Sequence, residues 1–204
     1  MYNEITFNYL NKNLNTNKIY FFFMPNIALY CDCYNNNRIN RENKVYILLN
    51  QEINNNYKNI SNLVSKYFKK IKLESKDKMV DDFVKQHYFD KMKLIDKFSK
   101  YKLIITDNWL GMIISVISES SCIVIDEQNE IFKNEYNNWF NELNYISFIN
   151  DYSDLEKKIM LLKNKNTNNI YNKKKYNEYF DKIKKFFLYD INITRNNNIY
   201  LSNN

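Results

Sequence analysis

The chain has 204 residues, of which 45% are hydrophobic and 26% are charged, and its formal net charge is +7. This length and apolar content suffice for one domain with a buried core and exclude an intrinsically disordered chain. No apolar run approaches the roughly eighteen residues of a membrane span, and residues 1–10 lack the apolar centre of a signal peptide, so we expect a cytoplasmic protein.

The positive charge is scattered among asparagines and acidic residues, so nucleic acid is not an expected partner. The densest lysines lie near the C-terminus, at helical spacing opposite a set of apolar residues. This pattern is typical of the solvated face of a helix, and a weak contact with an anionic surface is the alternative. The lysines are Lys173, Lys174, Lys175, Lys182, Lys184 and Lys185, and the apolar residues are Tyr176, Phe180, Ile183 and Phe187.

Three cysteines and a single histidine form neither a disulfide framework nor a metal-ligand set. These residues are Cys31, Cys33, Cys122 and His87. We therefore expect structural thiols in a reducing compartment, no metal and no cofactor.

Apolar runs and helical periods alternate along the chain. The expected strands cover residues 19–24, 45–49, 102–106, 122–125 and 145–149. The expected helices cover residues 53–71, 79–98, 109–117, 135–143, 154–162 and 176–188. Three strand segments are apolar on both faces, which predicts interior strands of a mainly parallel sheet covered by helices on both sides: Val45–Leu49, Leu103–Thr106 and Cys122–Ile125. The expected fold class is therefore α/β, and Rossmann-like.

The expected organisation has three parts. Residues 1–18 form a polar N-terminal segment, residues 19–165 form the sheet domain, and residues 166–204 form a C-terminal helix with a disordered, Asn-rich tail.

Ligands of parallel sheets bind beyond the carboxyl ends of the strands. Asn50 and Asn108 each follow such a strand, so we expect them to lie near each other, within about 15 Å. Gly111 is the only glycine of the chain, which indicates a position where a side chain does not fit, or else a chance survivor at a helix start. The helix that begins after Asp107 is expected to present free N–H groups that attract an anion weakly.

The segment Ile105-Thr106-Asp107-Asn108-Trp109-Leu110-Gly111-Met112, followed by a strand that begins Ser121-Cys122, resembles the polysaccharide pyruvyl transferase family. In that family a strand ends in Thr-Asp-Arg-Leu-His-Gly-Met and leads into a helix. Weaker matches occur in the expected order, and together they extend from residue 19 to about residue 162. They are Met24–Leu29, Leu48–Glu52, Tyr136–Phe140 and Leu143–Ile146.

The resemblance implies the C-terminal half of a GT-B-like fold, with another chain as a partner that supplies the N-terminal half. It implies transfer of a pyruvyl group, as a ketal, from phosphoenolpyruvate to a sugar of a cell-surface polysaccharide, with phosphoenolpyruvate and a glycan acceptor as partners. The implied substrate-binding residues are Asn50, Glu52, Asp107, Asn108, Trp109, Leu110 and Gly111.

The matching positions lack the family's reactive side chains. The family's Arg, thought to hold the donor, and its His, thought to supply the proton, are replaced by Asn108 and Leu110, and Asn50 stands where the family usually has Arg. Asparagine offers no charged fork and leucine transfers no proton. A lone His87 within a helical pattern is more often structural than catalytic.

Three functions remain open on these residues. The chain is a pyruvyl transferase, or another sugar-modifying transferase such as a GT-B-type glycosyltransferase fragment, with a rearranged site; a non-catalytic homologue that binds a sugar, an anion or a partner protein; or a structural fragment whose missing half another chain supplies. We expect negligible pyruvyl transfer from this chain alone.

Overall fold

The computed structural model describes residues 41–50, 55–75, 91–126, 130–164, 176–182 and 184–185. One compact unit spans residues 32–171 and contains a five-stranded sheet. Its strands are β1 (Glu42–Leu49), β2 (Lys70–Ser75), β3 (Tyr101–Thr106), β4 (Ser121–Ile125) and β5 (Ile146–Ile149). Its helices are α2 (Asn55–Ser65), α4 (Lys91–Ser99), α5 (Trp109–Ile117), α6 (Glu130–Glu135) and α7 (Leu155–Asn164).

All neighbouring strands of the sheet are parallel, in the order β2-β1-β3-β4-β5. The three strands that are apolar on both faces, β1, β3 and β4, occupy the interior of the sheet, as predicted. Because a strand covered on both faces has no side exposed to water, its sequence carries no polar alternation. The α/β, Rossmann-like fold class is confirmed.

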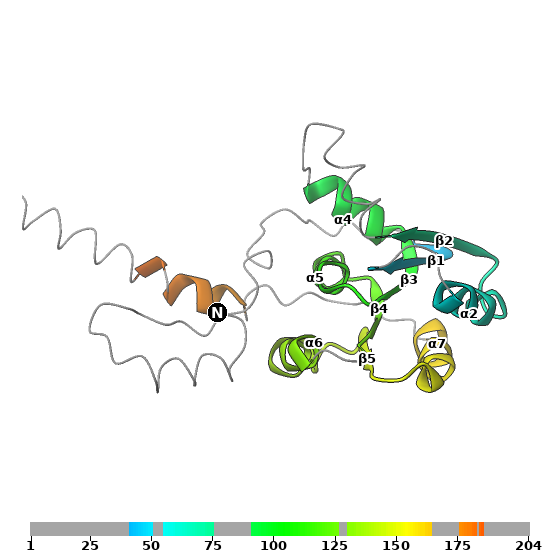
Figure 1. Ribbon diagram of the computed structural model, residues 1–204. Helices are drawn as coiled ribbons and strands as arrows, with labels where there is room; N and C mark the ends of the chain where they lie inside the picture. The colour runs from blue at the N-terminus through cyan, green and yellow to red at the C-terminus, as the bar shows by residue number, and fades with distance from the viewer. Residues whose placement is uncertain are drawn as a thin grey trace, which may run out of the picture. The chain divides into compact units, whose positions relative to one another are not determined.

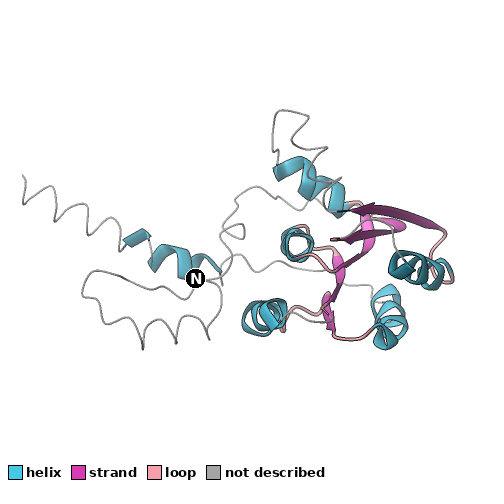
Figure 2. Ribbon diagram, in the orientation of Figure 1, coloured by secondary structure: helices cyan, strands magenta, loops and turns pink. Residues whose placement is uncertain are grey.

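Helices cover both faces of the sheet (Figures 1 and 2). Helices α2 and α7 lie on one face, where alternate strand residues such as Val45, Ile47 and Ile105 form a core cluster with the apolar faces of these helices. Helices α4, α5 and α6 lie on the other face, where Tyr46 stacks on Tyr101 at 5.0 Å between ring centroids.

The predicted helix over residues 53–71 is wrong in its second half. The helix ends at Ser65 and the edge strand β2 begins at Lys70. The apolar residues Tyr67, Phe68 and Ile71 continue the helical spacing by coincidence, whereas the alternation from Lys70 to Ser75 belongs to a strand with one polar side.

Helix α5 matches its predicted range, and the ends of α7 are shifted by one or two residues. Helix α4 confirms the end of the helix predicted over residues 79–98, of which residues 79–90 lie outside the described residues. The helix predicted over residues 135–143 begins earlier, at Glu130, and continues into a π-helical turn over Tyr136–Phe140. The wider turn buries the consecutive Trp139 and Phe140 together. A 3-10 turn over Tyr152–Asp154 precedes α7.

The C-terminal helix is described over residues 176–182 and belongs to a second compact unit. Tyr176 and Phe180 are buried, whereas Lys182, Lys184 and Lys185 are exposed, in agreement with a solvated lysine face over these residues. The other members of the predicted set lie outside the described residues: Lys173, Lys174, Lys175, Ile183 and Phe187. The predicted strand over residues 19–24 and the proposed domain boundaries at residues 18 and 165 lie outside the described residues.

In the part of the chain that the structure describes, no helix has the length and apolar character needed to cross a membrane.

Candidate functional site at the carboxyl rim of the sheet

The ends of β1 and β3 meet through the two asparagines that the sequence places at the rim. The Asn108 side-chain nitrogen Nδ2 donates a hydrogen bond to Asn50 Oδ1 at 2.6 Å. The backbone N–H of Asn50 donates to Asp107 Oδ1 at 2.7 Å, and Asn50 Nδ2 donates to the Asp107 carbonyl at 2.8 Å. The predicted proximity of Asn50 and Asn108 is confirmed, and these bonds hold the two strand ends together.

The Asn108 side chain also caps α5. Asn108 has an extended backbone (φ −112°, ψ 127°), and its Oδ1 accepts hydrogen bonds from the N–H groups of Leu110 at 2.8 Å and Gly111 at 3.3 Å. The expectation that these N–H groups are free is therefore wrong. An anion at this helix start would have to displace the side-chain amide of Asn108, a residue that is only 3% exposed.

Gly111 allows the first turn of α5 to approach the end of β3. A Cβ atom at Gly111 would lie 2.6 Å from Thr106 Oγ1, closer than van der Waals contact permits. Thr106 Oγ1 is fixed because it accepts a hydrogen bond from the Asn108 N–H at 3.0 Å. The predicted close approach at the only glycine is confirmed.

Trp109 contacts Glu135, the last residue of α6. The indole Nε1–H donates a hydrogen bond to Glu135 Oε2. Glu135 is only 3% exposed, and within the described residues its second side-chain oxygen, Oε1, has no hydrogen-bond partner. Burial raises the pKa of Glu135 from 4.5 to about 7, although the bond from Trp109 opposes the shift.

Sequence reasoning missed Glu135. A glutamate in an ordinary helical pattern carries no signal that its side chain will be buried against a neighbouring helix. The contact depends on how α5 and α6 pack, which only the folded chain defines.

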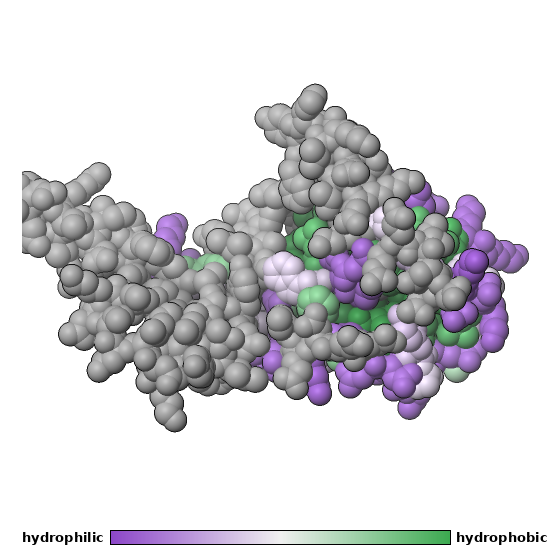
Figure 3. All heavy atoms as spheres, in the orientation of Figure 1, coloured by the Kyte–Doolittle hydropathy of each residue, from purple (hydrophilic) through white to green (hydrophobic). Residues whose placement is uncertain are grey.

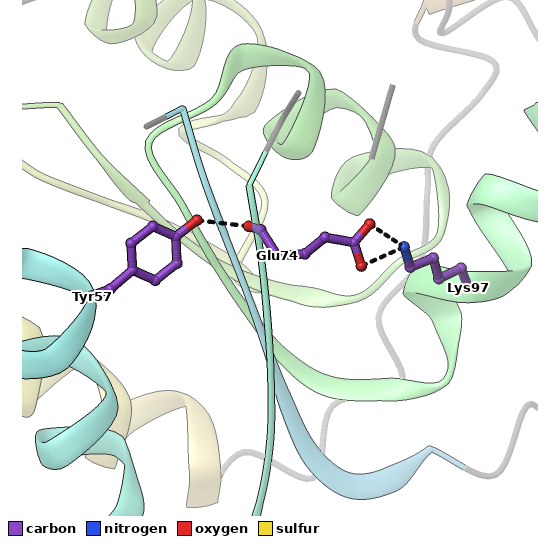
Figure 4. Close-up of polar contacts among 3 residues, drawn as sticks. All are labelled: Tyr57, Glu74 and Lys97. Atoms are coloured by element: carbon purple, nitrogen blue, oxygen red, sulfur yellow. Dashed lines mark hydrogen bonds and ion pairs between the residues drawn. The ribbon is translucent and has the colours of Figure 1, made fainter. Parts of the chain in front are cut away.

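A second polar cluster lies where β1 and β2 end (Figure 4). Tyr57 Oη of α2 accepts a hydrogen bond from the Leu49 N–H at 3.1 Å and donates one to the Glu74 carbonyl at 2.7 Å. Burial is the main cause that raises the pKa of Tyr57 to about 12. The Glu74 carboxylate, on the other side of the strand, receives two hydrogen bonds from Lys97 Nζ at 2.8 and 3.0 Å.

The remaining sequence-predicted residues fall into two groups. Leu110 is half-buried at the start of α5 and Asp107 is half-buried at the rim, whereas Glu52 and His87 lie outside the described residues. Among residues that the structure describes, no three His, Cys, Asp or Glu side chains come together as metal ligands. Cys122 is a buried thiol whose pKa burial raises to about 12, so it serves as a core residue.

No family model and no solved structure matches the chain. The chain is similar to general stress protein 30 of Bacillus subtilis (strain 168), with 34% identity over 70 residues. That similarity covers 33% of this chain and 20% of the relative, so the chain spans about a fifth of the length of the curated relative it matches. A partial similarity of this extent identifies no family.

Proposed function

We propose that this chain is a polysaccharide pyruvyl transferase-like domain that keeps the folded frame of the family's rim and lacks its chemistry. The family activity is the transfer of a pyruvyl ketal group from phosphoenolpyruvate to a sugar of a cell-surface polysaccharide. In this chain the rim binds a sugar or an anion at most, and it does not catalyse the transfer.

One observation carries the proposal: the hydrogen bonds of the Asn108 side chain all go to other parts of the fold. The position that resembles the family's donor-binding Arg holds a buried amide that caps α5 and bonds to Asn50. The amide carries no charge for the carboxylate and phosphate of phosphoenolpyruvate, and it covers two N–H groups that would otherwise face an anion.

The proton-transfer step lacks its group as well. Leu110 stands at the position that resembles the family's His, and removal of a proton donor typically costs about 10²–10⁴-fold in rate. Thr106 and Gly111 stand at the Thr and Gly positions of the family's motif, and the close approach between them supports the resemblance.

The first experiment measures phosphate release from phosphoenolpyruvate in the presence of an acceptor glycan. We expect no release above a control without protein. Release that depends on the glycan would overturn the non-catalytic reading and would strengthen the family assignment.

The second experiment tests whether the rim is a degenerate phosphoenolpyruvate site. Asn108→Arg removes the cap from the two N–H groups and adds a cation. We therefore expect phosphoenolpyruvate to bind about tenfold more tightly, a gain of about 1.4 kcal/mol in binding free energy, which is the size expected for one hydrogen bond to a charged group. The measurement is the ligand-induced rise in melting temperature of each variant relative to its own ligand-free state, because loss of the cap itself costs about 1 kcal/mol.

The matched control is Asn141→Arg, at an exposed asparagine after the π-helical turn. An equal gain in affinity for both arginine variants would mean that the added charge acts non-specifically. That result would contradict the assignment of the rim as a phosphoenolpyruvate-type site.

A further inference from the structure

A groove lies between α2 and α7 on the face of the sheet opposite α5. It has a volume of about 430 Å³, within the range of small-molecule sites. Its lining residues are Asn59, Ile60, Asn62, Leu63, Lys66, Tyr152 and Leu155. None of these residues belongs to the rim site. At the right of the view in Figure 3, where α2 and α7 lie, hydrophilic residues alternate with apolar patches.

The groove is amphipathic. Ile60 and Leu155 are buried in the core cluster, and the half-buried Leu63 and Tyr152 pack against that cluster, so they form an apolar base with one aromatic ring. Asn59, Asn62 and Lys66 are exposed. A saccharide ring has the matching character, since its C–H groups pack on apolar and aromatic surfaces and its hydroxyls bond to amides.

The polar groups of the groove are available to a ligand. Lys66 Nζ forms a salt bridge with Glu156 Oε1 at 3.8 Å, and the two side chains are 63% and 43% exposed. Because an exposed ion pair at this distance is weak, a ligand carboxylate can compete with Glu156 for the ammonium. Glu156 Oε1 already accepts a hydrogen bond from Tyr67 Oη at 2.5 Å. In the described part of the chain, no hydrogen bond engages the Lys66 ammonium or the side-chain amides of Asn59 and Asn62.

We propose that the α2–α7 groove binds a carboxylate-bearing sugar, a hexuronic acid residue of a glycan. The sugar ring packs on Tyr152 and the apolar base, its hydroxyls bond to Asn59 and Asn62, and its carboxylate pairs with Lys66. The ligand carboxylate replaces the exposed Glu156 carboxylate as the partner of the Lys66 ammonium, and a purely aliphatic ligand would leave the amides without partners. The inference rests on the proposed function, because it names the class of glycan that the domain recognises.

The test is an NMR titration of the full chain with sodium glucuronate, followed through the backbone amide signals. We expect saturable shifts at residues 59–66 and 152–155 with a millimolar dissociation constant, since small exposed sites retain little net binding energy. Glucose, which lacks the carboxylate, should bind about tenfold more weakly. Acetate, which lacks the ring, should also bind about tenfold more weakly. An absence of saturable shifts in these segments, or equal binding of acetate and glucuronate, would overturn the proposal.

Two variants separate the Lys66 contact from general charge. Lys66→Met should weaken glucuronate binding about tenfold, whereas Lys58→Met should leave it unchanged, because Lys58 is exposed on α2, which ends just before Lys66 in sequence, and does not line the groove. An equal loss of glucuronate affinity in the two variants would mean that positive charge acts non-specifically, and it would contradict the contact between Lys66 and the carboxylate. An oligomer of glucuronate should bind at least as tightly as the monomer, and failure of the oligomer alone would contradict a glycan ligand.

The glucuronate titration of the groove and the phosphoenolpyruvate test of the rim can fail separately. A gain in phosphoenolpyruvate affinity for Asn108→Arg without glucuronate binding would remove only the groove assignment. Glucuronate binding without that gain would leave a sugar-binding domain and remove the pyruvyl transferase-like rim.

Discussion

At the residue scale, Thr106 and Gly111 compete for one small volume at the rim. We expect Gly111→Ala to destabilise the domain by about 1–2 kcal/mol. The clash with Thr106 Oγ1 costs about 1–3 kcal/mol, and it outweighs the gain of up to about 1 kcal/mol that alanine brings to a helix. Urea denaturation of both proteins measures the difference.

Thr106→Ala in the same background provides the control. It removes the atom nearest the new methyl group, so the double variant should lose at least about 1 kcal/mol less than the sum of the single variants. Strict additivity would mean that Thr106 is not what excludes a side chain at position 111.

The rim shows which residue roles can be predicted from sequence. Proximity of Asn50 and Asn108 follows from two parallel strands ending at one edge, and the close approach at Gly111 follows from the rarity of glycine in this chain. The capping role of Asn108 was missed although its signal was present, because an asparagine directly before a helix is a preferred N-cap residue. Glu135 gave no signal, since its burial depends on helix packing.

At the element scale, α5 ends in a Schellman motif without the usual glycine. The Ser120 N–H donates to the Ser115 carbonyl at 3.0 Å and the Glu119 N–H donates to the Val116 carbonyl at 3.2 Å. Arg41 adds hydrogen bonds to the carbonyls of Ser118 and Glu119 at 3.1 and 2.8 Å. Glu119 takes the left-handed conformation at φ 54° that the motif demands.

We expect Glu119→Gly to stabilise the domain by about 1 kcal/mol, because a left-handed conformation costs a residue with a Cβ about 1–2 kcal/mol and costs glycine little. Glu119→Ala keeps the Cβ and should bring no gain. The unfolding midpoint in urea measures both variants, and an equal effect of the two would show that the Glu119 side chain, rather than the backbone, determines the change.

An ion pair between Lys97 of α4 and the buried Glu74 of the edge strand β2 connects the two elements (Figure 4). The Glu74 side chain is 4% exposed and Lys97 is 29% exposed. Lys97→Met leaves the carboxylate buried without its partner, so we expect a loss near the lower end of about 3–5 kcal/mol. Adding Glu74→Gln removes the charge and should restore most of the loss in thermal denaturation. A double variant as unstable as Lys97→Met would instead assign the loss to packing of the lysine.

Strand β2 also shows why one element of the sheet could not be predicted. The interior strands are unbroken apolar runs, whereas Lys70 to Ser75 alternates polar and apolar residues after a helix whose apolar spacing continues past its end. As an edge strand, β2 forms its backbone hydrogen bonds with β1 alone, and this pairing exists only once the sheet has assembled.

At the scale of the whole molecule, the parallel sheet and its rim can be predicted from the alternation of apolar strands with helices in the sequence. The pKa values of the carboxyl groups cannot be predicted in this way. Glu42 and Asp151 have exposed carboxyls with lowered pKa values, the first mainly through its bond to Lys44 and the second mainly through the Ser153 N–H. Glu135 is the opposite case, because burial raises its pKa to about 7. The pH dependence of stability therefore contains contributions of opposite sign.

The Glu135 contribution can be isolated with Glu135→Gln, which keeps an acceptor for Trp109 and removes the ionisation. Between the unfolded pKa of 4.5 and the folded pKa of about 7, the folded state binds more protons than the unfolded state. Its free energy of unfolding therefore falls as pH rises through this window, by up to about 3 kcal/mol. The wild type should lose stability relative to Glu135→Gln between about pH 5 and pH 8 in urea denaturation. The control Glu142→Gln, at an exposed carboxylate, should track the wild type, and a constant difference for Glu135→Gln across this range would show that Glu135 is ionised throughout.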